Sequence, residues 1–520
     1  MVQTVFTATL NGVEALPVCV EVAVRRGTPM IGFVGLVPAS ARECRERFRS
    51  SAAQLGLRVP GLRITVNLAP ADVRKEGAAF DLPVAVAVLA GAGHVPTDRA
   101  RRWALVGELG LDGTVRKVRG VLPIALMLQG TPAIEGLIVP ADNLAETRPA
   151  AGLRVLGARN LAEVLAFLRG EGDLVPARAA SGLHPGGERG GIDYSEVAGQ
   201  AAAKRALEIA AAGGHNVVLR GAPGVGKTLL AQALSSILPP LSREEALEVT
   251  TVHSVAGMLP AGVGLLKRSP FRAPHHTVTT AGLVGGGNSA RPGEISLAHH
   301  GVLFLDEVTE FRTPVLEALR QPLEEGAVWI TRAGSHVRFP ARFLLVAAMN
   351  PCACGRLGTS PHPCVCSPAM VRRHMARLSA PFLDRIDLHV DVEPLEWSEI
   401  RVNHKGRESP RMRRSVMAAR RRAAVRNGPT HPLNARIPHR ALADRCRLEA
   451  SADALMGRSA SRYGFSVRAC HRLLRVARTI ADLEACDHVR RGHVAEALQF
   501  RWRQPAAGSG QGGTGGREGR

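Results

Sequence analysis

No apolar run in this sequence is long enough to cross a membrane. The most apolar stretch, Leu82 to Gly93, falls well short of the roughly 20 residues that a membrane helix needs. The first residues also lack the apolar segment of a secretory signal, because Glu14 and Glu21 come early. With nine cysteines and no such signal, we expect a cytoplasmic protein whose thiols are free or bound to a metal.

Acidic residues are also in short supply. The chain has 45 aspartates and glutamates against 67 lysines and arginines, which gives a formal net charge of +22. This excess favours a polyanionic partner such as nucleic acid. The alternative is an arginine-rich composition that carries no function.

Aromatic residues make up only 4% of the 520 residues, but hydrophobic residues make up 45%, enough for two to four domain cores. Patterning predicts an α/β domain, a Gly- and Pro-rich linker, a second α/β domain, a basic helical region and a disordered tail. These segments cover residues 1–168, 169–191, 192–395, 396–503 and 504–520, in that order.

A phosphate-binding loop is predicted directly after a short apolar strand at Asn216–Arg220. The pattern G-x-x-x-x-G-K-T is met by Gly221, Ala222, Pro223, Gly224, Val225, Gly226, Lys227 and Thr228. Residues 229–238 then continue with helical spacing. Such a loop binds phosphate through backbone N–H groups and the lysine, and the Thr228 hydroxyl would coordinate Mg²⁺. The predicted ligands are therefore ATP and Mg²⁺.

Two carboxylates follow a second apolar strand, at Asp306 and Glu307. Asp306 would bind Mg²⁺, and Glu307 would act as the general base on the attacking water. Taken alone, the segment could equally be a core strand that ends in an acidic turn.

Three further polar residues are candidates for contacting the γ-phosphate. Asn350 follows the apolar strand 343–349, where open α/β sheets form nucleotide sites. Arg385 is a candidate arginine finger for a neighbouring subunit, and Arg468 opens a later helix. The alternative for Arg385 is an ordinary surface ion pair.

These motifs and several longer strings resemble the YifB/ComM group of magnesium-chelatase-like AAA+ ATPases. The strings are Ile64–Asp72, Lys75–Gly77, Phe80–Pro83, Ala206–Ala212, Phe271–His276, Pro292–His299 and Val476–Leu483. The resemblance implies a P-loop AAA+ core, with a parallel sheet, flanking helices and insertions in the helix-2 and pre-sensor-1 regions. It also implies a Lon-protease-like α/β domain at the N-terminus and a C-terminal helical lid.

The resemblance further implies a hexameric DNA helicase that drives branch migration in recombination or in the integration of transforming DNA. By similarity Asn350 is sensor 1, Arg385 the arginine finger and Arg468 the sensor-2 arginine. Two alternatives stay open, a magnesium-chelatase-type motor and a protein-remodelling ATPase.

Peptidase activity is not expected from the N-terminal domain. In Lon-type proteases a serine nucleophile follows Lys-Asp-Gly-Pro, whereas here Ala79 stands at the serine position. The segment 120–126 offers no lysine to act as the base. The Ser–Lys chemistry is therefore absent.

A β-hairpin over residues 328–342 is the first candidate for contacting DNA. Arg332, His336 and Arg338 lie near its turn, where cations could bind phosphates without reading sequence. An ordinary solvated hairpin is the alternative. A second cluster, seven arginines between residues 411 and 426, either faces DNA or solvates a helix.

Two C-x-C pairs follow the sensor strand, formed by Cys352, Cys354, Cys364 and Cys366. Four thiolates at this spacing could surround a tetrahedral structural Zn²⁺ ion. Metal-free thiols are the alternative, since C-x-C is less diagnostic than C-x-x-C.

Overall fold

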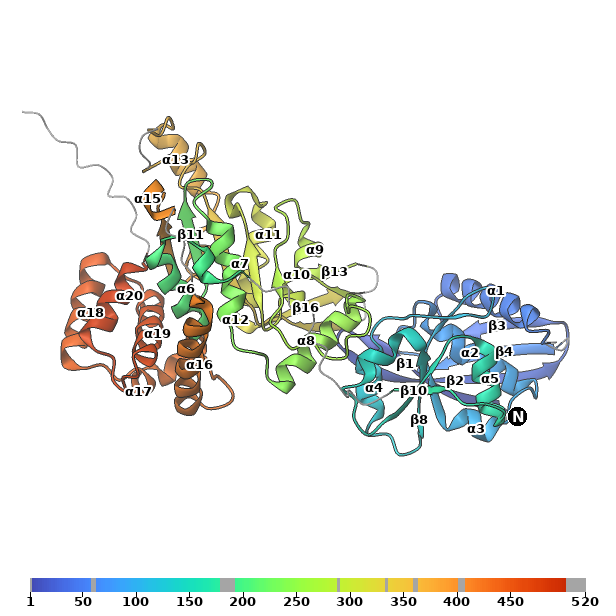
Figure 1. Ribbon diagram of the computed structural model, residues 1–520. Helices are drawn as coiled ribbons and strands as arrows, with labels where there is room; N and C mark the ends of the chain where they lie inside the picture. Colours follow the sequence, from blue (N-terminus) through green and yellow to red (C-terminus); the bar gives the residue numbers. More distant parts are fainter. Residues whose placement is uncertain are drawn as a thin grey trace, which may run out of the picture. The chain divides into compact units, whose positions relative to one another are not determined.

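The computed structural model describes residues 2–57, 62–177, 192–287, 290–332, 335–358, 363–400 and 407–501 (Figure 1). The chain divides into two compact units. One contains Met1–Gly190, Pro240–Leu303 and Glu317–Phe343, and the other contains Gly191–Pro239, Phe304–Leu316 and Leu344–Arg520. The predicted tail, 504–520, lies outside the described residues, as does 178–191 of the predicted linker. No helix in the described ranges is long and apolar enough to cross a bilayer.

The first unit is built on an eight-stranded sheet with the order β10-β9-β8-β5-β1-β2-β4-β3. The strands are β1 (Val2–Asn11), β2 (Glu14–Arg26), β3 (Met30–Val34), β4 (Leu62–Ala69), β5 (Trp103–Leu105), β8 (Gly136–Pro140), β9 (Arg154–Ala158) and β10 (Val175–Pro176). Its helices are α1 (Pro38–Gln54), α2 (Asp81–Gly91), α3 (Thr97–Arg101), α4 (Val121–Leu128) and α5 (Leu161–Arg169). Most of α2 is apolar and buried, so this helix forms the centre of the core.

The start of the predicted linker is ordered. Val175 and Pro176 form β10, which pairs antiparallel with β9 at the edge of the sheet. The backbone N–H of Ala177 also donates to the Val155 carbonyl. Composition alone missed this pairing, because a two-residue edge strand has no periodicity of its own.

The first unit also holds short elements from the middle of the chain. They are α8 (Arg243–Ala256), α9 (Thr280–Val284), α10 (Glu294–Leu297), α12 (Arg320–Glu325) and the paired strands β13 (Gly285–Gly286) and β14 (Arg291–Pro292). Strands β6 (Glu108–Leu109) and β7 (Val115–Arg116), from the N-terminal part of the chain, form a separate pair in the same unit. The predicted hairpin is present as β16 (Ala327–Arg332) and β17 (Ser335–Pro340). Part of the predicted second domain, Pro240–Leu303 and Glu317–Phe343, thus belongs to this unit. The domain limits drawn from the sequence stay predictions.

A second sheet has the strand order β12-β15-β18-β11-β19. The strands are β11 (Val217–Gly221), β12 (Phe271–Arg272), β15 (Val302–Leu305), β18 (Leu344–Met349) and β19 (Leu388–Val392). Strand β11 pairs in parallel with both β18 and β19. Strands β15 and β18 are buried along their whole length, as expected for a parallel sheet covered on both faces. A mixed α/β fold with parallel strands is therefore confirmed.

The remaining helices are α6 (Ala201–Gly213), α7 (Lys227–Ile237), α11 (Thr313–Glu317), α13 (Pro368–Met375), α14 (Ala380–Leu383), α15 (Trp397–Ile400), α16 (Glu408–Asn427), α17 (Leu442–Arg445), α18 (Ala450–Tyr463), α19 (Val467–Leu483) and α20 (Arg491–Gln499). The C-terminal helices α16 to α20 form a compact group, coloured orange to red in Figure 1. The helical C-terminal region predicted from the sequence is confirmed.

Several arginines of α16 bind groups within the second unit. Arg413 donates to the Ser236 carbonyl, and Arg420 donates to the Ala211 carbonyl. Arg426 forms a 2.6 Å ion pair with buried Asp482. These side chains therefore hold α16 against its neighbours, which favours the structural interpretation for this part of the arginine cluster.

Candidate nucleotide-binding site

The P-loop joins β11 to α7 and turns sharply at its glycines. Gly224 and Gly226 have φ angles of +80° and +91°, which L side chains rarely adopt. A Cβ atom at either position would meet nothing within 4 Å, so the backbone conformation alone requires glycine. Helix α7 begins at Lys227, and its first N–H groups are thereby presented at the loop.

Lys227 lies at the centre of the site. Its side chain is only 8% exposed, and its ammonium group donates to the carbonyls of Gly221 and Ala222 at 2.8 Å each. The third donor reaches Oδ1 of Asn350 at 3.2 Å. Burial lowers the pKa of Lys227, while the nearby carboxylates Asp306 and Glu307 oppose that shift.

The acidic pair lies at the same edge of the sheet. The Thr228 hydroxyl donates to Oδ2 of Asp306 at 2.8 Å, and the backbone N–H of Glu307 donates to Oδ1 of Asp306 at 2.9 Å. Glu307 has a φ of +49°, a left-handed conformation that is uncommon for a residue with a side chain. Such strain persists where the surroundings enforce it, often at functional sites.

Asn350 directly follows β18, as the sequence predicts. Its side chain contacts Lys227, and its carbonyl accepts a hydrogen bond from Nε2 of His374 at 3.1 Å. His374 is buried in α13 and was not singled out from the sequence. Its partner lies 24 residues earlier, a separation that no local pattern encodes. The structure thus brings together Lys227, Thr228, Asp306 and Asn350.

The two candidate cations Arg385 and Arg468 lie on other elements. Arg385 follows α14, is half-buried, and donates to the Pro381 carbonyl at 2.6 Å. Arg468 is exposed in the first turn of α19. Their contacts with nucleotide stay predictions.

In the first unit, Ala79 lies in a 3₁₀ turn over Ala78–Phe80 and is half-buried. Lys75 is buried, and its ammonium group donates to the Pro70 carbonyl. Residue 79 therefore offers a methyl group and no hydroxyl nucleophile, and the absence of peptidase activity stays a prediction.

Two of the hairpin candidates for DNA contact, His336 and Arg338, share one face of β16 and β17 with a tryptophan. Trp329 pairs with Arg338, whose guanidinium lies 5.9 Å from the indole ring centre, and Thr331 pairs with His336. Trp329 is 52% exposed and was overlooked in the sequence. The side chain of Arg332 lies outside what the structure describes.

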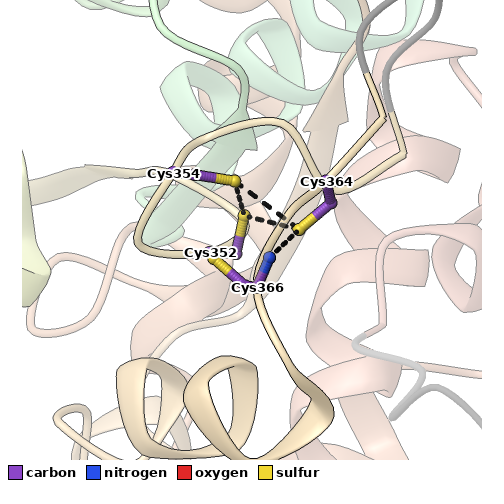
Figure 2. A group of neighbouring side chains, drawn as sticks. All are labelled: Cys352, Cys354, Cys364 and Cys366. Carbon is purple, nitrogen blue, oxygen red and sulfur yellow. Dashed lines mark hydrogen bonds between the residues drawn. The ribbon is translucent and has the colours of Figure 1, made fainter.

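The four cysteines of the C-x-C pairs converge after β18 (Figure 2). Their sulfur atoms all lie within 4.8 Å of one another. The N–H groups of Arg356 and Val365 hold the pKa of the Cys354 thiol down to about 6. The predicted metal ligands are therefore gathered at one point.

Three family models match the chain. Residues 193–400 match magnesium chelatase, subunit ChlI, residues 20–143 match subunit ChlI of Mg-chelatase, and residues 406–501 match the ChlI C-terminal region. A protein called magnesium-chelatase 38 kDa subunit, from Rhodobacter capsulatus, is 27% identical over 176 residues, which are 30% of this chain and 50% of that protein.

Other relatives are similar along almost their whole length. YifB of Salmonella typhimurium is 41% identical over 499 residues, and these cover 96% of each chain. The competence protein ComM of Haemophilus influenzae is 40% identical over 501 residues, covering 96% of this chain and 97% of ComM. With its glycine-rich loop, acidic strand end and parallel sheet, the chain belongs to the YifB/ComM family of magnesium-chelatase-like AAA+ proteins.

Proposed function

We propose that this protein is an ATP-hydrolysing motor that works as a ring of identical subunits, a hexamer, on DNA in the cytoplasm. The observation that carries the ATPase is the meeting of three strand ends at one point. Lys227 and Thr228 follow β11, and they contact Asn350 after β18 and Asp306 after β15. Nucleotides bind at this kind of edge in open α/β sheets.

Each residue has a task that its position suits. Lys227 and the N–H groups of the loop would bind phosphate oxygens, and Asn350 would orient the γ-phosphate. The oxygens of Thr228 and Asp306 fit Mg²⁺, which prefers hard oxygen ligands and supplies positive charge to the phosphates. Glu307 is exposed next to Asp306, where a carboxylate could take a proton from the attacking water.

A ring would complete this site. Arg385 follows α14, and the family resemblance implies that it contacts the ATP bound by a neighbouring subunit. An arginine in this role stabilises the charge that develops on the phosphate during transfer. Arg468 would supply a second cation from within the subunit.

DNA is the favoured track for three reasons. The chain carries a net charge of +22, and the exposed face of the hairpin combines cations with an aromatic ring. Trp329 could stack on a base, while Arg338 and His336 contact phosphates. A relative of nearly equal length is named a competence protein, in keeping with branch migration during recombination or the integration of transforming DNA.

The test is ATP-dependent migration of a labelled four-stranded junction by the purified protein, together with DNA-stimulated ATP hydrolysis. Lys227→Ala serves as the inactive control. We expect migration by the wild type alone, with hydrolysis stimulated by DNA. A rate of ATP hydrolysis that no DNA junction increases would overturn the DNA proposal and leave a chelatase-type or protein-remodelling motor.

A further inference from the structure

Four thiols meet in the loop that follows β18. The Sγ atoms of Cys352, Cys354 and Cys364 lie 3.4–3.5 Å from one another, and Cys366 completes the group (Figure 2). None of the four forms a disulfide. Cys352 is fully buried, and the other three are half-buried. Two short segments of the loop therefore present all their cysteines to a common centre.

The spacing of the sulfur atoms suits a single metal ion. In a tetrahedral Zn²⁺ site with Zn–S bonds of about 2.3 Å, the sulfur atoms are about 3.8 Å apart. An iron–sulfur cluster places several metal ions and sulfides between its thiolates, so it needs sulfur atoms farther apart. A ligand set of sulfur alone also disfavours Mg²⁺ and Ca²⁺, which prefer oxygen.

The backbone around the thiols is arranged as an outer shell. The N–H of Cys366 donates to Sγ of Cys364 at 3.4 Å. A hydrogen bond of this kind stabilises a thiolate and orients it toward a metal. Four protein ligands would leave no open position on a tetrahedral metal ion, so an ion bound here would have a structural role.

The loop also touches the P-loop. Gly355, one residue after Cys354, has a φ of +74°, and a Cβ atom there would lie 2.6 Å from Cδ of Pro223. Cys352 follows Asn350 by two residues. Fixing the cysteines therefore fixes both the segment after the sensor asparagine and the surface against which Pro223 rests.

We propose that Cys352, Cys354, Cys364 and Cys366 bind one structural Zn²⁺ ion, which holds the loop after β18 against the P-loop. The metal site stands on its own geometry, whereas its effect on nucleotide binding rests on the proposed ATPase. Gly355 is a positioning residue in this scheme, because it acts on the nucleotide only through Pro223.

The first test is the metal content of the full-length protein after dialysis against EDTA. We expect one zinc per chain in the wild type and in Cys19→Ser, whose thiol lies on β2, and little zinc in the Cys354→Ser/Cys364→Ser double variant. Substitution of wild-type zinc by Co²⁺ should give the intense visible bands of a tetrahedral tetrathiolate, a readout that needs no variant. Wild-type protein without zinc, or cobalt spectra of oxygen or nitrogen ligation, would overturn the site.

The second test separates positioning from folding. Gly355→Ala should keep its zinc but raise the KM for ATP by about tenfold, because misplacement of a binding group by a fraction of an ångström is costly. Gly358→Ala is the matched control, since its φ is +82° and a Cβ atom there would meet nothing within 4 Å. Equal KM values in the two variants would refute the contact with Pro223. If the wild type lacks zinc but hydrolyses ATP, the zinc proposal is wrong and the proposed ATPase activity is retained. If the wild type and Lys227→Ala both bind zinc and neither hydrolyses ATP, the zinc proposal is retained and the proposed ATPase activity is wrong.

Discussion

The Thr228 hydroxyl donates a 2.8 Å hydrogen bond to Oδ2 of Asp306, although the two residues lie 78 positions apart in the chain. This contact joins the first turn of α7 to the end of β15. It brings a hydroxyl and a carboxylate oxygen together beside Lys227, as a site for Mg²⁺ and a triphosphate requires.

Removal of the hydroxyl should therefore change the Mg²⁺ requirement. In Thr228→Ala, we expect the Mg²⁺ concentration for half-maximal ATP hydrolysis to rise by about tenfold, because one oxygen ligand is removed. Thr228→Ser keeps the hydroxyl and should resemble the wild type. A Mg²⁺ titration of ATPase activity makes the comparison, and identical curves for all three proteins would exclude Thr228 as a ligand.

Arg385 should act on the ATP of a neighbouring subunit. Arg385→Ala is expected to bind ATP normally but to hydrolyse it about 1,000-fold more slowly, since arginine fingers are worth roughly 10³–10⁵ in rate. Mixing Arg385→Ala with Lys227→Ala subunits should restore part of the activity, because the second variant supplies the arginine to an intact P-loop in the first. Arg377→Ala, which removes a surface pair with Glu310, is the control. No recovery on mixing would contradict an arginine supplied across the interface.

The exposed hairpin face should bind DNA. Trp329→Ala should weaken single-stranded DNA binding by about 10-fold, in line with stacking energies of roughly 1–3 kcal/mol per base. Arg338→Ala should also lower the slope of log K against log salt by about 1, because the variant neutralises one phosphate fewer. Fluorescence anisotropy at several salt concentrations measures both.

The control for the hairpin is the variant Arg63→Ala. Arg63 is exposed on β4 of the eight-stranded sheet. The substitution changes the net charge by the same amount as Arg338→Ala. If Arg63→Ala and Arg338→Ala shift the salt dependence equally, general charge and not the hairpin is responsible.

Much of the arrangement of the candidate nucleotide site could be predicted from the sequence because its signals are local. Strand, glycine loop, lysine and helix are consecutive at residues 217–237, so their spacing alone predicts a phosphate site. Asp306 and Asn350 each directly follow an apolar strand, and parallel strands end at a common edge. Which side chains meet there depends on strand order, which no local pattern carries.

The surface features were harder to predict for the same reason. The arginines of α16 form a single charge run in the sequence, but Arg426 is committed to Asp482, 56 residues later. In the sequence, Trp329 is indistinguishable from an ordinary strand residue, because only the pairing of β16 with β17 places it opposite Arg338. Composition gives the number of charged and aromatic residues, but their function depends on which side chains they contact in the fold.

A buried histidine in the first unit predicts a pH dependence of stability. Nδ1 of His299 accepts a 2.9 Å hydrogen bond from the Arg342 N–H, so its Nε2–H donates to Glu248 at 2.8 Å and the ring is neutral. Burial lowers the pKa of His299 from 6.5 to about 4. Between these pH values the unfolded chain binds more protons than the folded one, so stability is full above pH 6.5 and falls as the pH drops toward 4.

This one group should account for a loss of about 3 kcal/mol in the free energy of unfolding across that window. Urea unfolding followed by tryptophan fluorescence at pH 7 and pH 4.5 tests it, with His299→Gln as the comparison. The variant is expected to be less stable at pH 7 but to lose less on acidification. Parallel losses in both proteins would show that His299 does not titrate in this way.

The central claim is that one ATP molecule binds between the loop bearing Lys227 and the carboxylates Asp306 and Glu307. Equilibrium binding and single-turnover hydrolysis of radiolabelled ATP by the wild type, Lys227→Ala and Glu307→Gln test it most directly. We expect the wild type to bind and hydrolyse ATP, Glu307→Gln to bind it but leave it intact, and Lys227→Ala to bind it poorly. Hydrolysis by Glu307→Gln at the wild-type rate, or unchanged ATP affinity in Lys227→Ala, would contradict the claim.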